Sequence, residues 1–328
     1  MDQNFLAALS EFASARDQCF LCRRELRSSD LLTREHVFPR WLQTRYQLWD
    51  MKLGLLNHSR ITYRQLLIPC CAACNGEHLS RLEQVVRRGV ARGFDEFRRI
   101  DPRYVHQWLA KIFFGLLFRE LSLKLDQTDP LSDSIVDLEM INTYKVIRMF
   151  LQGIRLDVTT EGPKEPWSVF LCRMEPGANV ASDFDYLDNV AGVAGIRMSD
   201  VGAIVCFDDA GIVKNHLAPM LRPLDQVSLK PLQFTELVAA VIYLRRRLIH
   251  PPNWLYKGPR DASRMILVPH THYFCDCPEF GPANVEEWVD LFAQYLVPHR
   301  LGVKDIFEPP NRVRSFIAAG GDYVTFPG

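Results

Sequence analysis

The chain has 328 residues, of which 48% are hydrophobic and 24% are charged, and its formal net charge is zero. This composition is that of an ordinary globular protein, and the length favours two domains over one. The longest apolar runs, residues 113–118 and 237–244, fall short of the ~20 residues that span a bilayer. Because the first residues also lack the basic and apolar regions of a secretory signal, we expect a cytoplasmic protein without a membrane-spanning helix.

The positive charge is concentrated near the N-terminus. Residues 1–103 contain 17 Lys and Arg residues against 12 Asp and Glu residues, and 16 of those 17 are arginine. The planar arginine fork suits phosphate oxygens and base edges, so a nucleic-acid partner is one interpretation. An arginine-rich face exposed to solvent is the other interpretation, and charge alone does not separate the two.

The predicted elements of this basic part follow the order strand, loop, strand, helix. A short helix is expected over residues 1–17, and the apolar segment 31–42 is expected to form a strand that ends near His36. Residues 62–69 are expected to form the return strand. After Asn75 the apolar residues recur at helical spacing, which predicts a helix.

A domain boundary is predicted at Asp101-Pro102, because a residue before proline disfavours helix and proline suits the start of a new helix. The chain then divides into a domain of residues 1–100 and a domain of residues 101–328. Helices are expected over residues 104–125, 132–154, 232–250 and 285–297. Strands are expected over residues 167–174, 190–198, 201–209 and 264–275. Without the regular βαβ alternation of a nucleotide-binding fold, the predicted fold class is α+β.

Two CxxC pairs, Cys19/Cys22 and Cys71/Cys74, form the strongest motif in the chain. In a cytoplasmic protein such cysteines favour metal binding over disulfides. Four thiolates complete the closed tetrahedral site of a structural zinc ion, which contributes of order 10 kcal/mol to folding. The adjacent Cys70 is out of the CxxC register, and we expect it to be a buried thiol.

Between the two pairs lies Glu35-His36, followed by Pro39, and Asn75 comes directly after the second pair. The order CxxC, EHxxP, CxxCN, over residues 15–95, resembles the zinc-braced branch of the HNH endonucleases, which have the ββα-metal fold. The resemblance implies three catalytic residues. Glu35 and Asn75 would hold a divalent cation, and His36 would act as general base on water.

The chemistry of these residue types agrees with those roles. The oxygen ligands of Glu35 and Asn75 suit Mg²⁺ or Mn²⁺, which neutralises charge on a phosphate. A histidine with a pKa near 6.5 is largely neutral at pH 7 and can accept a proton from water. The resemblance also implies a role in bacterial restriction or anti-phage defence, with the larger domain selecting a target, a partner protein or a second copy of the chain.

The chain departs from the family pattern at two positions. Members often have an asparagine five residues before the third cysteine, where it ties down the loop between the two strands. Here that position is Leu66, and Gln65, Thr62 and Asn57 are the candidates for its role. A lysine that often follows three residues after the last ligand is replaced by His78, which can contact phosphate, bind metal or simply be exposed.

The predicted function is that of a metal-dependent endonuclease that acts on DNA, most simply on duplex DNA. The side chains expected to contact its phosphates are Arg34, Arg40, His78, Arg81 and Arg88. Two alternatives remain open: a catalytically inactive, zinc-stabilised nucleic-acid-binding module, favoured by the missing asparagine, and a nuclease directed at RNA. A weaker candidate for a second metal cluster is formed by His270, His272, Cys275 and Cys277.

Overall fold

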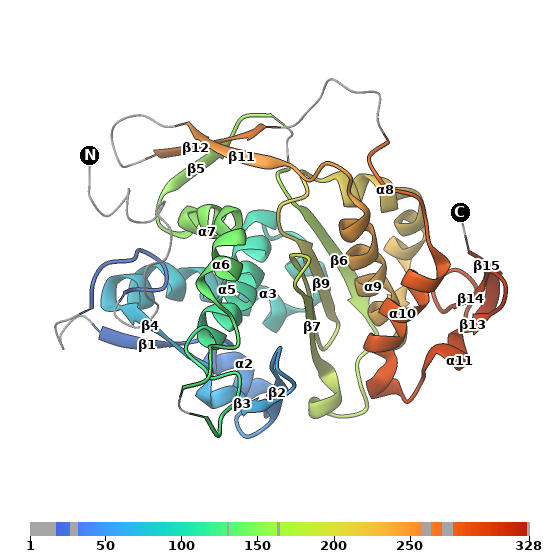
Figure 1. Ribbon diagram of the computed structural model, residues 1–328, viewed down its shortest axis with the longest axis horizontal. Coiled ribbons are helices and arrows are strands. Elements are labelled where there is room, and N and C mark those ends of the chain that lie inside the picture. The colour runs from blue at the N-terminus through green and yellow to red at the C-terminus, as the bar shows by residue number, and fades with distance from the viewer. Residues whose placement is uncertain are drawn as a thin grey trace. The chain divides into compact units, whose positions relative to one another are not determined.

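The structure of the protein is a computed structural model that describes residues 18–26, 32–129, 131–162, 165–257, 264–270 and 278–326. Its contacts divide the chain into two compact units (Figure 1). The first unit comprises Met1–Lys164 with two short later segments, Asn179–Ser182 and Trp254–Pro269, and the second unit comprises the rest. The helix expected over residues 1–17 lies outside the described residues.

The first unit contains a two-stranded hairpin followed by a helix. Strand β1 (Leu32–His36) pairs antiparallel with β4 (Leu67–Cys71). A π-helical turn leads from β4 into α3 (Ser80–Arg92). The predicted order of strand, strand and helix is therefore confirmed. The second strand starts later than expected, because Tyr63–Gln65 forms a 3₁₀ turn before it.

The segment between the two strands has regular structure of its own. Helix α2 (Arg40–Arg45) follows β1 directly, and it begins after Pro39, whose fixed φ suits the start of a helix. A small antiparallel hairpin of β2 (Lys52–Gly54) and β3 (Arg60–Thr62) comes next.

Helix α5 (Pro102–Glu120) is the most buried helix of the first unit. It starts where predicted, because Asp101 accepts a hydrogen bond from the backbone N–H of Arg103 and a proline takes the first position. Every residue from 105 to 118 is buried, and the helix packs on α3, β4 and α7 (Lys145–Leu151). These contacts keep α5 with the hairpin, so the unit extends beyond the boundary predicted at residue 100.

The remaining elements of the first unit differ in part from the predictions. The helix expected over residues 132–154 is divided into α6 (Leu138–Thr143) and α7, because Asp137 caps α6 and Tyr144 leaves the helical conformation between them. A three-stranded sheet lies in the order β11, β12, β5. The bounds of its strands are Asn253–Lys257 for β11, Arg264–His270 for β12 and Asp157–Thr160 for β5.

The second unit is built on a five-stranded sheet in the order β10, β6, β9, β8, β7. The strand bounds are Ser168–Met174 for β6, Phe184–Asn189 for β7, Val193–Met198 for β8, Val201–Cys206 for β9 and Ser228–Leu229 for β10. Strands β8 and β9 form the predicted hairpin, and Ser199 in the turn between them has a positive φ of 55°. Neighbouring strands are antiparallel throughout β6, β9, β8 and β7, whereas β10 pairs parallel with β6.

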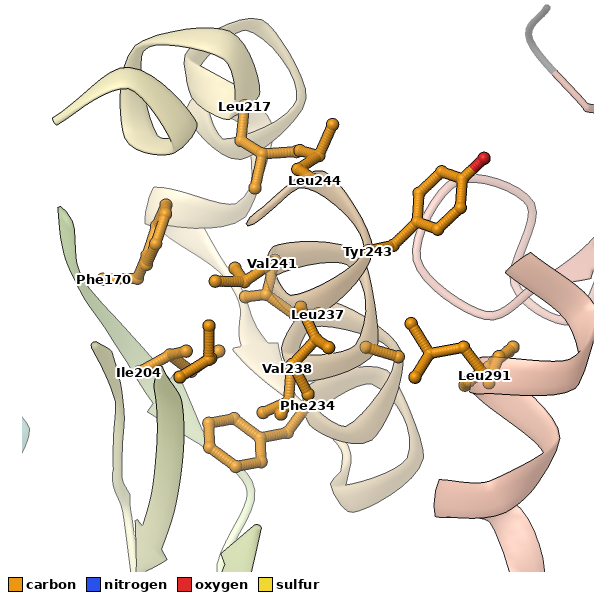
Figure 2. Close-up of a cluster of buried hydrophobic side chains, with 14 of the residues drawn as sticks. Phe170, Ile204, Leu217, Phe234, Leu237, Val238, Val241, Tyr243, Leu244 and Leu291 are labelled. Carbon is orange, nitrogen blue, oxygen red and sulfur yellow. The ribbon is translucent and has the colours of Figure 1, made fainter. Parts of the chain in front are cut away.

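Helix α9 (Pro231–Arg247) is the centre of the core of the second unit. It lies between the sheet and α10 (Val285–Leu296), with Ile204 of the sheet on one side and Leu291 of α10 on the other (Figure 2). Helix α8 (Ile212–Leu221) covers one end of α9. The close approach of α9 to the sheet depends on Gly195, where a Cβ would lie 2.6 Å from Val238 Cγ2 of α9.

A short helix and a small sheet complete the second unit. They are α11 (Val303–Ile306) and, in order, β13 (Phe307–Glu308), β14 (Arg312–Ser315) and β15 (Asp322–Thr325). The α+β class is confirmed. Within the described ranges, no helix is long and apolar enough to cross a membrane.

Candidate functional site

The four predicted zinc ligands converge. The Sγ atoms of Cys19, Cys22, Cys71 and Cys74 all lie within 4.8 Å of one another, and all four side chains are buried. The Cys22 and Cys71 sulfur atoms are 3.8 Å apart, which is about the separation of two thiolates that bind one tetrahedral zinc ion at ~2.3 Å. The residues therefore fit a structural zinc ion.

Backbone geometry explains why the first pair lies against the second. Cys19 accepts from the N–H of Arg23 through its carbonyl, in a tight turn where Arg23 has a positive φ of 61°. The N–H of Phe20 donates to the carbonyl of Pro69 on β4, and the N–H of Cys71 donates to Cys19 Sγ at 3.3 Å. These bonds fix the first thiol pair beside the end of the hairpin.

The thiols also hydrogen-bond one another. Hydrogen bonds from Cys22, Cys70 and Cys71 lower the pKa of Cys19 to about 3, so the cluster already favours a thiolate at this position. Cys70 Sγ lies 3.8 Å from Cys19 Sγ, yet Cys70 is not one of the four whose sulfur atoms are mutually close. Its side chain is fully buried, as expected for the thiol outside the motif.

Glu35, His36 and Asn75 line one pocket of about 440 Å³. The first two come from the end of β1, where Glu35 lies opposite Ile68 of β4, and Asn75 comes from the π-helical turn after β4. Arg34 and Arg40 line the same pocket, together with Trp41, Ser80, Glu83 and Arg87. The structure thus brings together the three residues that the motif singled out.

The carboxylate of Glu35 is held by a buried lysine. Lys111 Nζ lies 2.6 Å from Glu35 Oε1 and 3.1 Å from Glu83 Oε1, and the Lys111 side chain is completely buried. Burial acts to lower the pKa of Lys111, but the charges of both carboxylates outweigh it and raise that pKa, so the lysine is charged. Burial raises the pKa of Glu83 to about 7, against the opposing effect of Lys111.

Lys111 also fixes the backbone at the end of β1. Its Nζ donates to the carbonyl oxygen of His36 at 2.5 Å and to that of Val37 at 3.0 Å. The next carbonyl, of Phe38, accepts from Gln43 Nε2 at 2.7 Å. Two buried side chains from α5 and α2 therefore hold three successive carbonyls, those of residues 36–38, at the end of β1.

In the described part of the chain, none of the three candidates for the missing asparagine bonds the carbonyls of residues 36–38, although Asn57 Nδ2 donates to the carbonyl of Leu125. Leu66 itself is buried and accepts from the N–H of Val37 through its carbonyl. Gln65 and Thr62 bond each other within their own turn, and Asn57 accepts from Ser59 in the β2–β3 turn.

His36 is a half-buried imidazole at the edge of the pocket. Burial lowers its pKa, the charge of Glu35 acts to raise it, and the charges of Arg40 and Lys111 lower it further. The ring is therefore neutral at pH 7. Gln43 Nε2 lies 3.3 Å from His36 Nδ1, and since the Gln43 amide donates there, the neutral ring carries its proton on Nε2.

Asn75 is oriented by a single hydrogen bond. Its Nδ2 donates to Thr33 Oγ1 at 2.9 Å, and Thr33 Oγ1 donates to the carbonyl of Cys70 on the paired strand. Because the amide nitrogen is used in this bond, the amide oxygen is the group left to act as a ligand.

The residues that line this pocket include candidate oxygen ligands for a divalent cation. The carboxylates of Glu35 and Glu83 share one positive charge, that of Lys111. A carboxylate that accepts one bond from lysine retains further lone pairs that can bind a metal ion. Together with the oriented Asn75 they supply oxygen ligands, the type that Mg²⁺ and Mn²⁺ prefer.

The other predicted phosphate contacts are divided among different surfaces. His78 and Arg81 line a separate pocket of about 290 Å³ with Tyr104 and Arg155. Burial and the charge of Arg155 lower the pKa of His78. Arg88 is exposed on α3 and lines none of these pockets.

Sequence reasoning missed Lys111, Gln43 and Glu83. Lys111 had a detectable signal, because it is the one charged residue between positions 104 and 118, in a run that is otherwise mostly apolar. Glu83 lies eight positions after Asn75, on the same helical region. The weaker cluster at His270, His272, Cys275 and Cys277 falls mainly on residues outside the described ranges and stays a prediction.

Comparison with known proteins gave no relatives: the chain matches no protein-family model, no curated protein and no solved structure.

Proposed function

We propose that this protein is a metal-dependent endonuclease of the HNH type that hydrolyses phosphodiester bonds in DNA. The observation that carries the proposal is the convergence of Glu35, His36 and Asn75 on one pocket, next to a cluster of four cysteines that fits zinc. Each of these residues has an ordinary structural explanation when taken alone. Nuclease chemistry accounts both for the order of these residues in the sequence and for their position around one pocket.

His36 is the proposed general base. Its lowered pKa keeps it neutral at pH 7, ready to accept a proton from water. That proton is accepted at Nδ1, the nitrogen without hydrogen, so water must replace the Gln43 amide there. The 3.3 Å separation between Gln43 Nε2 and His36 Nδ1 is longer than that of a usual hydrogen bond. Replacing the amide by water therefore costs little free energy.

Glu35 and Asn75 are the proposed ligands of Mg²⁺ or Mn²⁺, with Glu83 as a further carboxylate in the pocket. When bound, such an ion stabilises the negative charge that develops on the phosphate and on the leaving oxygen. Lys111 keeps the Glu35 carboxylate and the backbone of His36 in place. Arg34, Arg40 and Arg87 supply positive charge at the edge of the pocket for the substrate phosphates.

The inactive-module alternative rested on the absence of the loop asparagine. Lys111 and Gln43 hold the carbonyls of residues 36–38, which is the kind of contact that the asparagine would provide. This favours the catalytic proposal over the inactive one. The same site chemistry serves RNA, and the substrate comparison below addresses that alternative.

A matched pair of histidine variants tests the proposal. His36→Asn removes the base, whereas His58→Asn makes the same change at an exposed turn residue whose φ of 62° suits asparagine. We expect His36→Asn to lose plasmid nicking in Mg²⁺ by at least ~100-fold while keeping its zinc content and melting temperature, since general-base catalysis contributes about 10²–10⁴-fold. His58→Asn should nick like the wild type. Undiminished nicking by His36→Asn contradicts the proposal.

A further inference from the structure

A larger cleft, of about 840 Å³, lies beside the candidate catalytic pocket, and Arg34 lines both. Its walls come from β4, from the β2–β3 hairpin and from the end of α5 with the residues after it. Four cations line the cleft: Arg34, Arg60, Arg119 and Lys124. None of the described residues that line it is acidic.

The positive charge in this cleft is poorly compensated. Arg119 is partly buried, and both burial and the charge of Arg34 lower its pKa. Within the part of the chain that the structure describes, its Nη1 donates to Ser122 Oγ, its Nε has no hydrogen-bond partner, and no carboxylate lies within ion-pair distance. The charge of the exposed Arg34 adds to the free-energy cost of burying the Arg119 guanidinium, and an anionic ligand offsets that cost.

Apart from Gln65, Ser122 and Gln127, the rest of the described lining is apolar. Its half-buried apolar residues are Ile61, Leu67, Pro69 and Leu123. A surface that combines arginine side chains with apolar groups matches a nucleotide, whose phosphate is anionic and whose base has an apolar face. The volume is within the range of pockets that enclose a small ligand, so a strand with unstacked bases can enter it. A base-paired duplex keeps its bases stacked inside and cannot present them to these side chains.

We propose that this cleft binds a single strand of nucleic acid and leads it to the Glu35–His36 pocket through Arg34. The binding itself is independent of catalysis, whereas the direction of the strand toward the pocket rests on the proposed nuclease function. The substrate class is then a nucleic acid with an unpaired segment, such as a negatively supercoiled plasmid also offers, rather than the fully paired duplex expected from the sequence. DNA and RNA strands have the same phosphates, so the test includes both.

Fluorescence anisotropy with labelled strands tests the binding. The protein carries His36→Asn and the buffer contains EDTA, so that no strand is cut. The probes are oligo-dT and oligo-rU of about 12 nucleotides, a hairpin duplex of similar length, and inorganic pyrophosphate as competitor. We expect at least one of the two single strands to bind about tenfold or more tightly than the duplex.

Four substitutions at three arginines locate the binding. Arg119→Gln and Arg60→Gln remove cleft cations, and Arg60 is exposed, so its loss does not endanger folding. Arg64→Gln is the matched control, because Arg64 is also exposed, neighbours the cleft residue Gln65 and pairs with Asp50 outside the cleft lining. Each cleft substitution should weaken binding about tenfold and reduce the salt dependence by roughly one phosphate contact, while Arg64→Gln binds unchanged. Arg119→Lys, which keeps the charge, should retain most of the affinity.

Three results overturn the inference: equal or tighter binding of the duplex, equal affinities for Arg60→Gln, Arg119→Gln and Arg64→Gln, or displacement of the strand by pyrophosphate at concentrations near the strand's own. The last would show a site for a small anion only. Failure of the nuclease proposal looks different, because single-strand binding would persist in a protein that never cuts.

Discussion

Replacement of Lys111 by methionine tests the buried charge cluster most sharply. Methionine is close to lysine in length and suits an apolar helix, so the main loss is the ammonium group. In the wild type that group bonds four oxygens, from Glu35, Glu83 and the carbonyls of His36 and Val37. Lys111→Met leaves two carboxylates close together without their cation.

The expected loss of unfolding free energy is about 3–5 kcal/mol at pH 7.5, the usual cost of removing one partner of a buried ion pair. The loss should shrink as the pH falls toward 5, because the isolated carboxylates can then take up protons. Urea unfolding followed by circular dichroism gives both values. The control Lys145→Met removes an exposed lysine of the same unit and should change stability by less than about 0.5 kcal/mol.

A double-mutant cycle with Glu83→Gln separates the pair from the packing. If the two carboxylates cause the loss, Glu83→Gln should cost much less in the Lys111→Met background than alone. A Lys111→Met variant within 1 kcal/mol of the wild type, or strictly additive effects, would refute the reasoning.

Three further predictions concern the zinc cluster and the second unit. Cys71→Ser should lose bound zinc and unfold at lower temperature, whereas Cys70→Ser, at the neighbouring buried thiol, should keep its full zinc content. Metal analysis measures both. Zinc loss in Cys70→Ser but not in Cys71→Ser would show that Cys70, and not Cys71, is the zinc ligand. Gly202→Ala should lower the unfolding free energy, measured by urea titration, by about 1–3 kcal/mol. The reason is that a Cβ there would lie 2.5 Å from Cys172 Sγ and 2.8 Å from Met174 Sδ. Gly54→Ala, with open space around it, should have little effect in the same titration. Burial raises the pKa of Asp209 from 3.8 to about 6, so the folded state binds the extra proton between those values and stability falls as the pH rises through them. Since one pKa unit corresponds to about 1.4 kcal/mol, the stability of the wild type relative to Asp209→Asn should fall by up to about 3 kcal/mol from pH 4 to pH 7, and a pH-independent difference would contradict this.

Local patterns predicted the elements that local forces determine. The end of β1 at His36, the helix after Asn75 and the start of α5 at Pro102 each depend on apolar spacing, a proline or a cap within a few residues. The zinc cluster was also predictable, because the four cysteines stand at ligand spacing and the metal requires them to meet.

The remaining features depend on contacts that local sequence does not encode. Lys111 reaches the end of β1 from 75 positions away, and it does so because helix α5 buries residues 105–118 in the first unit. Strand β12 pairs with β5 across more than 100 residues. The basic cleft combines cations from distant parts of the chain, so it was not visible as a charge run. The phosphate contacts predicted from the sequence were Arg34, Arg40, His78, Arg81 and Arg88, and they did not include Arg60 or Arg119.

The measurement that tests the central claim most directly is plasmid nicking by the zinc-loaded wild type with and without a second divalent cation. We predict no nicking after mild EDTA treatment that leaves the zinc in place, recovery on addition of Mg²⁺ or Mn²⁺, and no recovery in His36→Asn. Nicking that needs no added cation, or equal activity in wild type and His36→Asn, would contradict the assignment of Glu35, His36 and Asn75 as a metal-dependent nuclease site.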